Sequence, residues 1–228
     1  MRINSGEKCL AVVLLMFASC MVYAGDHRLL IEDVTLIDGT GRQPVEHISV
    51  LIQGERIRQI NRAGFSKSER RKARIINGKG KYLIPGLMDI HVHLVGSIKV
   101  GKDGIRKVEL NTDKGIRALH GYLYSGVTSI FDSGNIPDYI FALREQERSG
   151  KIISPRIYAA GGIVTYPGSH GSGAGATLVD DWPEAKPLLD EHMKRLPDML
   201  KLTLEERGWG ARPLIPKLPL SLMEKIIE

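Results

Sequence analysis

The pattern of apolar and polar residues changes near Leu83 and divides the chain into two regions. Before this point, short apolar stretches at residues 29–38, 48–53 and 57–60 are separated by glycine-containing turns, which is typical of β-strands. After it, strand-like stretches beginning near residues 87, 127, 156 and 199 alternate with helical stretches, which predicts four parallel βα units. We therefore expect an α/β protein in which a β-rich part, residues 25–82, precedes a βα part, residues 83–228.

The first 24 residues have the composition of a secretory signal peptide. Arg2 and Lys8 precede an apolar run from Cys9 to Tyr23, which is shorter than the roughly 20 residues of a membrane-spanning helix. Cleavage after Ala24 would release an exported protein, either periplasmic or secreted. As an alternative, residues 17–20 (FASC) are close to a bacterial lipobox, which would make the protein a lipoprotein held at a membrane through Cys20.

Composition and charge narrow the class of protein. With 228 residues, 43% hydrophobic and 25% charged, the chain can bury a core and is neither disordered nor fibrous. Its net charge of +6 and the basic cluster at residues 67–74 would suit nucleic acid, but that cluster lacks interleaved aromatic residues. We therefore expect a solvent-exposed loop there and no nucleic-acid partner, and the sequence leaves the oligomeric state open.

Two histidines one residue apart end the strand predicted from residue 87. Successive side chains of a strand point to opposite faces, so Asp89, His91 and His93 are expected on one face and the apolar residues Ile90, Val92 and Leu94 on the other. Neutral imidazole is a good ligand for zinc and similar ions, and a pair at this spacing can hold one ion without backbone strain. The pattern predicts a divalent metal site at this strand end.

The same residues carry a family motif. Residues 85–93 (PGLMDIHVH) read Pro-Gly-hydrophobic-hydrophobic-Asp-x-His-x-His, and in this motif the chain resembles the amidohydrolase superfamily of metal-dependent hydrolases. Residues 126–134 (GVTSIFDSG) and 154–162 (SPRIYAAGG) resemble its second and third barrel strands, most closely in the imidazolonepropionase-like and prolidase-like branch. The resemblance implies a partial (β/α)8 TIM-like barrel, its first four βα units, preceded by half of a small β-sandwich domain.

A lysine lies on the fourth predicted strand. Residues 197–204 alternate so that Lys201 is on the face opposite the leucines, where desolvation would lower the pKa of its amine. The neutral amine can react with CO2 to form a carbamate, an anion able to bridge two cations. The stretch from Asp198 to Lys201 resembles the context in which the family's fourth-strand lysine does this. The alternative is a lysine that extends out of the barrel end into solvent.

Two further residues lie where strands meet loops. Asp132 follows the second barrel strand and is expected to hydrogen-bond the loop, with a direct catalytic role as the alternative. His170 resembles a loop histidine that follows the third strand in this branch and contacts substrate, and a surface-loop histidine is the alternative reading.

Together these features predict a metal-dependent hydrolase of carbon–nitrogen bonds other than ordinary peptide bonds, acting on cyclic amides or dipeptide-like small molecules. His91 and His93 would bind one divalent ion, expected to be zinc, and carbamylated Lys201 would bridge it to a second. Because such a barrel takes about 250 residues and residues 83–228 supply fewer, we expect a truncated chain with little activity of its own. A noncatalytic exported metal-binding or interaction module is the alternative.

Overall fold

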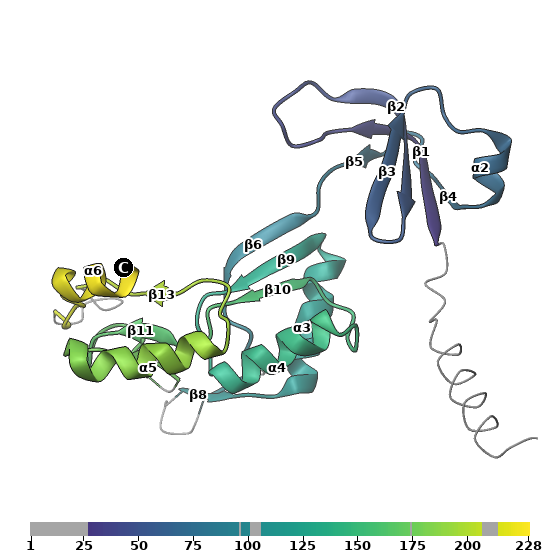
Figure 1. The fold of residues 1–228 in the computed structure, drawn as a ribbon. Helices are drawn as coiled ribbons and strands as arrows, with labels where there is room; N and C mark the ends of the chain where they lie inside the picture. The colour runs from purple at the N-terminus through teal and green to yellow at the C-terminus, as the bar shows by residue number, and fades with distance from the viewer. Residues whose placement is uncertain (1–26, 96, 101–105, 174, 207–213) are drawn as a thin grey trace, which may run out of the picture. The chain divides into compact units, whose positions relative to one another are not determined.

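A computed structural model describes residues 27–95, 97–100, 106–173, 175–206 and 214–228. The predicted signal peptide, with Cys9, Cys20 and the cleavage site after Ala24, lies outside the described residues. The described chain forms two compact units, one ending at Pro85 and the other beginning at Gly86 (Figure 1). None of the helices in the described ranges has the length and apolar character that crossing a bilayer requires.

The first unit is built on one five-stranded sheet, as the β-rich pattern predicts. Its strand order is β3-β2-β1-β4, and β5 also pairs with β1. The β1–β2 and β2–β3 pairs are antiparallel, whereas β4 and β5 run parallel to β1. The strands are β1 (Arg28–Leu36), β2 (Val45–Gln53), β3 (Arg56–Asn61), β4 (Arg74–Asn77) and β5 (Tyr82–Leu83). Val34, Ile48 and Val50 are the buried centre of its apolar core.

The basic cluster of this unit begins with a short helix, so the expectation of a loop was wrong. In α2 (Lys67–Arg71), the Ser66 hydroxyl accepts a hydrogen bond from the Glu69 amide, and the Glu69 carboxylate accepts one from the Ser66 amide. This reciprocal capping satisfies backbone groups that a short helix otherwise leaves unpaired. The helix is exposed, as expected for the cluster, and Arg70 forms an ion pair with Glu32 of β1.

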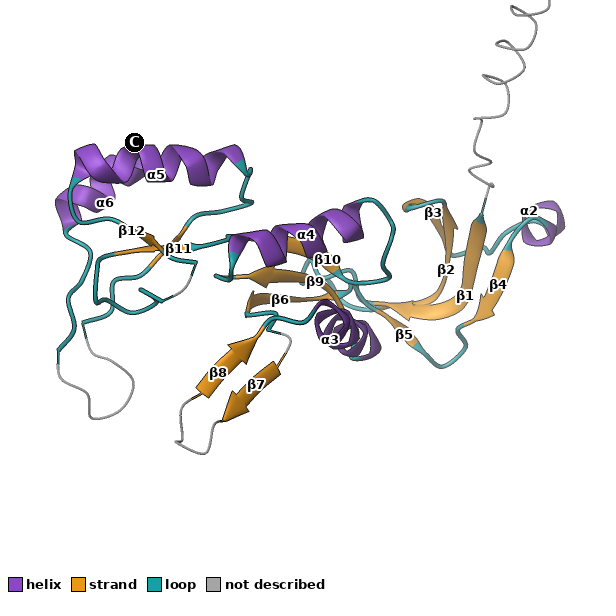
Figure 2. Cartoon of the chain, turned by 90° about the horizontal axis from the view of Figure 1, so that it is seen from below, coloured by secondary structure: helices purple, strands orange, loops and turns teal. Residues whose placement is uncertain are grey.

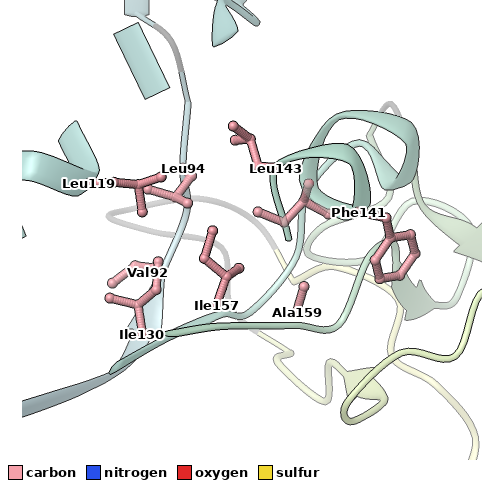
Figure 3. Close-up of a cluster of buried hydrophobic side chains, with 9 residues drawn as sticks. Val92, Leu94, Leu119, Ile130, Phe141, Leu143, Ile157 and Ala159 are labelled. Atoms are coloured by element: carbon pink, nitrogen blue, oxygen red, sulfur yellow. The ribbon is translucent and has the colours of Figure 1, made fainter. Parts of the chain in front are cut away.

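The second unit opens with the predicted alternation of parallel strands and helices. A three-stranded parallel sheet, β10-β9-β6, has α3 and α4 as the connections between its strands (Figures 1 and 2). These elements are β6 (Leu87–Val92), α3 (Thr112–Tyr124), β9 (Val127–Asp132), α4 (Pro137–Arg148) and β10 (Arg156–Ala159). Figure 3 shows the core that joins them, in which apolar side chains of the three strands pack against Leu119 of α3 and Leu143 of α4.

The fourth predicted strand does not join this sheet. β13 (Lys201–Leu202) pairs in parallel with β11 (Ile163–Thr165), in a second small sheet completed by β12 (Thr177–Leu178). A break at Gly161 separates β11 from β10. Gly161 has a φ of +73°, and a Cβ built there would lie 2.7 Å from the Phe141 ring, so the chain turns at a position that only glycine fits well. The helices α5 (Trp182–Lys194) and α6 (Leu220–Ile227) pack on this second sheet around Val164, Val179 and Leu218.

A hairpin between β6 and α3 was not expected from the sequence. The strands β7 (Ser97–Val100) and β8 (Arg106–Glu109) pair antiparallel (Figure 2). The observed architecture of this unit is therefore mixed α/β, with several small sheets in place of one continuous four-stranded sheet.

Candidate metal-binding site

A cavity of about 570 Å³ lies in the second unit, where β6 and β13 end. The predicted metal ligands His91, His93 and Lys201 and the predicted substrate-contacting His170 all line it. Side chains that follow Lys201 along the chain also line the cavity. Its polar lining consists of His91, His93, His170, Lys201, Thr203 and Glu205.

The two histidine rings lie on the same side of β6. Their centroids are 5.4 Å apart and their planes are inclined at 71°. Val92 and Leu94 point the other way and are buried in the core shared with α3 and α4 (Figure 3). This is the arrangement that alternation along a strand predicts for His91 and His93, and it leaves both rings exposed to the cavity.

Farther back along β6 the alternation does not hold. Asp89 pairs with Ile130 and Val92 with Asp132, so β6 contains one residue more than β9 between these two pairs. Such a bulge changes which face the side chains on either side of it occupy. Asp89 accordingly does not line the cavity, and Ile90 is exposed and not packed under the helices, which corrects the expectation for both residues.

A backbone carbonyl fixes the orientation of the His93 ring. The Nδ1 atom of His93 lies 2.7 Å from the carbonyl oxygen of Gly134, in the loop after β9. Because a carbonyl oxygen only accepts hydrogen bonds, Nδ1 is the donor, and in the neutral ring Nε2 then carries the lone pair. Metal-ligating histidines in proteins are held in the same way, with the second ring nitrogen bonded to a carbonyl or carboxylate.

Asp132 holds together the two chain segments that position His93. Its carboxylate accepts hydrogen bonds from the amides of Leu94 (2.7 Å) and Gly134 (3.2 Å) and from the Asn135 side chain (2.9 Å). Burial raises the pKa of Asp132, and these hydrogen bonds oppose the rise without cancelling it. Asp132 is fully buried and does not line the cavity, so its contacts are those of loop hydrogen bonding, the first of the two roles considered for it.

Lys201 enters the cavity from β13. It stands opposite Ile163 in the β11–β13 pairing, and its neighbours Leu200 and Leu202 pack against the core beneath α5. Its side chain thus points away from the helical layer, as the alternation of residues 197–204 predicts. The chemistry of a bound metal at His91, His93 and Lys201 stays a prediction.

The loop histidine His170 is tied to the end of β13 by contacts between residues far apart in the sequence, which local sequence patterns do not reveal. Its Nδ1 atom lies 3.0 Å from Oε2 of Glu205. Its carbonyl oxygen lies 3.0 Å from the Thr165 hydroxyl and 2.8 Å from the Thr203 hydroxyl, and the two hydroxyls lie 2.6 Å apart. Each hydroxyl has one proton, so at least one of them donates to the carbonyl and the other donates either to the carbonyl or to its neighbour. Glu205 could have been found from the alternation itself, since Lys201, Thr203 and Glu205 occupy every second position.

The donor set in the cavity suits a divalent ion such as zinc. Two imidazoles share one side of β6, and one of them has its Nε2 lone pair directed by the bond to Gly134. Within the described residues, no group of three or more histidine, cysteine, aspartate or glutamate side chains is arranged to hold a metal. A third ligand from this part of the chain would therefore come from Lys201, which binds a cation only as a neutral amine or as a carbamate.

No protein-family profile and no curated protein sequence matches the chain. Solved structures do match it. A prolidase complexed with N-methylphosphonate-L-proline is 21% identical, with a TM-score of 0.72 over 88% of this chain and 52% of its own. A Xaa-Pro dipeptidase with methionine bound in its active site is 25% identical, with a TM-score of 0.69 over 88% and 53%. A structure described as an amidohydrolase is 21% identical, with a TM-score of 0.66 over 83% and 49%.

The chain spans about half the length of each of these structures. The similarity covers both the sheet of the first unit and the βα segments of the second, because 83–88% of the chain is matched. These matches show that the chain shares the fold of these structures over most of its 228 residues.

Proposed function

We propose that the chain provides the metal-binding half of a hydrolase that cleaves carbon–nitrogen bonds in small molecules. The observation that carries the proposal is the convergence of His91, His93 and Lys201 on one cavity at the ends of β6 and β13. The likeness to a prolidase, a Xaa-Pro dipeptidase and an amidohydrolase supports the same class of reaction. The substrate we propose is a small amide, either cyclic or dipeptide-like.

In this proposal each residue of the cavity has a separate task. His91 and His93 would hold a divalent ion, expected to be zinc, and the Gly134 carbonyl fixes the orientation of the His93 ring. Lys201, as its carbamate, would be a further ligand, with the capacity to hold a second ion as well. When bound, such ions polarise the carbonyl of an amide and activate water. His170, held by Glu205 and by the two threonine hydroxyls, contacts the substrate from the loop after β11.

We propose that these 228 residues alone have little hydrolase activity. The described residues offer three candidate ligands, and this number leaves a second ion without a full coordination shell. We propose that the residues needed for turnover come from the part of the barrel that the related structures contain and this chain does not span.

Zinc binding and amide hydrolysis, measured together, test the proposed function. The wild-type chain should bind zinc with an affinity that falls in His91→Ala and in Lys201→Ala. A protein extended to the length of the related structures should hydrolyse Xaa-Pro dipeptides or lactams, and removal of the metal with a chelator should abolish this activity. Hydrolysis that persists after complete metal removal would contradict the proposal.

A noncatalytic metal-binding module is the second candidate. The small ligand set among the described residues favours it, because two histidines and a lysine can hold an ion without supplying a proton shuttle. Zinc binding without turnover of any amide, lactam or dipeptide by the extended protein would support this candidate over the hydrolase.

A further inference from the structure

A partly buried ion-pair cluster lies just ahead of Lys201 in the chain. Asp198 forms ion pairs with two arginines of α4, Arg144 at 2.7 Å and Arg148 at 2.9 Å, and each arginine contacts a different carboxylate oxygen. The Arg144 side chain is only 7% exposed. Burying a guanidinium is unfavourable unless its donors are satisfied, so this cluster needs a structural reason.

The contacts of the cluster fasten the segment that leads into β13. Arg144 also donates to the carbonyl oxygens of Leu196 (2.9 Å) and Arg195 (3.1 Å), at the turn after α5. Leu196 there has a φ of +52°, a conformation that is unfavourable for leucine and has to be held by its surroundings. The Arg144 guanidinium thus contacts three groups of one short segment: the carbonyl oxygens of Arg195 and Leu196 and the carboxylate of Asp198.

Asp198 in turn fastens this segment to the end of β10. Its amide donates to the Ala159 carbonyl (3.0 Å), and its carboxylate accepts from the Ala159 amide (2.9 Å). Desolvation raises the pKa of Asp198, but the Ala159 amide and the two arginines outweigh it, so that its pKa is lowered overall and the carboxylate is ionised at neutral pH. Both of its oxygens are therefore committed to fixed partners.

The strand that carries Lys201 is short, and the contacts that hold it lie on both sides of the lysine: the Asp198 cluster before it, and the Thr203 hydroxyl after it. β13 consists of two residues, and it pairs only with β11 among the described strands. Asp198 lies at a bend three residues before Lys201, so a shift at the cluster reaches the lysine through only two intervening residues. A displacement of about 1 Å is enough to impair a site that depends on ligand geometry.

We propose that Asp198, together with Arg144 and Arg148, is a positioning group that sets where Lys201 enters the cavity and thereby its capacity to bind metal. The inference rests on the proposed role of Lys201 as a metal ligand. It gives the three-residue spacing between Asp198 and Lys201 a physical reason: the aspartate fixes the segment that leads into β13, and Lys201 is the first residue of that strand.

The chain contains a matched control for this proposal. Glu147, also on α4 and largely buried, pairs with Arg156 at 3.2 Å and accepts from the Ile157 amide at 3.4 Å. It fastens the start of β10 to the same helix in a similar way. No proposed metal ligand follows on that strand, so Glu147→Gln should affect folding stability without affecting the metal site.

The test is zinc titration of the chain in bicarbonate buffer, with circular dichroism to verify folding. We expect Asp198→Asn to weaken zinc binding about 10- to 100-fold, the range observed when groups that support a metal ligand are removed. Glu147→Gln should leave the affinity within about twofold of wild type. In a Lys201→Ala background, Asp198→Asn should have no additional effect, because the two residues then act as one unit. If Asp198→Asn fails to fold, Arg148→Ala tests the same cluster. It is a milder change, because the Arg148 side chain is 41% exposed.

The outcomes separate this inference from the proposed function. If wild type binds zinc and Lys201→Ala binds it more weakly, but Asp198→Asn behaves like Glu147→Gln, the positioning role is wrong and the proposed function stands. Equal losses from Asp198→Asn with and without Lys201 would also contradict the positioning role, because the effect would not pass through the lysine. A wild-type chain that binds no zinc, or a Lys201→Ala variant that binds it normally, overturns the assignment of Lys201 and this inference with it.

Discussion

The Nδ1 atom of His93 and the carbonyl oxygen of Gly134 are 2.7 Å apart, although 41 residues separate them in the chain. This contact joins the end of β6 to the loop after β9 and assigns the ring proton to Nδ1. Gly134 has a φ of +140°, and a Cβ at this position would lie 2.4 Å from the Ile163 side chain. The glycine thereby lets its carbonyl reach the ring in a crowded part of the site.

Removal of either ring of the histidine pair should abolish most of the metal affinity. We expect His91→Ala and His93→Ala each to weaken zinc binding more than about 100-fold, because loss of a supporting group alone costs about 10- to 100-fold. Competition with a chromophoric chelator measures this. His120→Ala is the control, since His120 is exposed on α3 and does not line the cavity. An equal loss in His120→Ala would argue against the assignment.

Two glycine-to-alanine substitutions should change folding stability in opposite directions. Gly161→Ala should destabilise the fold by more than about 1 kcal/mol, because its φ is +73° and the Phe141 ring occupies the space of the new methyl group. Gly121→Ala should stabilise it by about 0.5–1 kcal/mol, because Gly121 lies within α3 and a Cβ there meets no atom within 4 Å. Urea unfolding of both variants measures the difference. A Gly161→Ala variant as stable as wild type would show that the break between β10 and β11 does not depend on glycine.

The Asp198 cluster should contribute stability that depends on pH. The pKa of Asp198 is lowered in the folded chain, so its contribution is fully present above the ordinary aspartate value of 3.8 and is lost as the pH falls through the lower folded value. At pH 7 we expect Asp198→Asn to lower the free energy of unfolding by about 3 kcal/mol, as for other broken buried ion pairs. Denaturant titrations between pH 3 and pH 7 should show the gap between wild type and variant narrowing at the acid end. A gap that widens there would contradict the direction of the shift.

The N-terminal segment carries a separate prediction about export. Expressed in a bacterium with its first 24 residues intact, the protein should be processed after Ala24, and mass spectrometry of the mature N-terminus measures the cleavage position. Processing before Cys20 with an added lipid mass would instead support the lipoprotein alternative. An unprocessed chain retained in the cytoplasm would contradict both.

Local patterns in the sequence predicted the elements of the second unit but not how all of them pair. The strands at residues 87, 127 and 156 and the helix beginning at Pro137 follow from periodicity and from the preference of proline for the first turn. The bulge between Asp89 and Val92 depends on pairing with β9, about 40 residues away. The partnership of β13 with β11 depends on the backbone break at Gly161. Both features depend on pairing between distant segments or on backbone conformation, so they cannot be predicted from a short stretch of sequence.

For the candidate site, too, the sequence predicted some residues and not others. His91, His93 and Lys201 were predicted because they combine a strand position with a resemblance to a family motif, and their residue types alone would not have been enough. Glu205 and the Asp198 cluster were missed, because an acidic residue near a strand end has many uses and its partners lie on other elements. The contact of His170 with Glu205, separated by 35 positions along the printed sequence, became visible only in three dimensions.

We propose that His91 and His93 bind one divalent ion together, and an anomalous-scattering map from crystals of the chain grown with zinc would locate that ion. We expect one anomalous peak in the cavity, about 2.0–2.1 Å from the Nε2 atom of His93 and from one ring nitrogen of His91. A peak elsewhere in the chain, or two rings in the cavity without a peak between them, would contradict the claim.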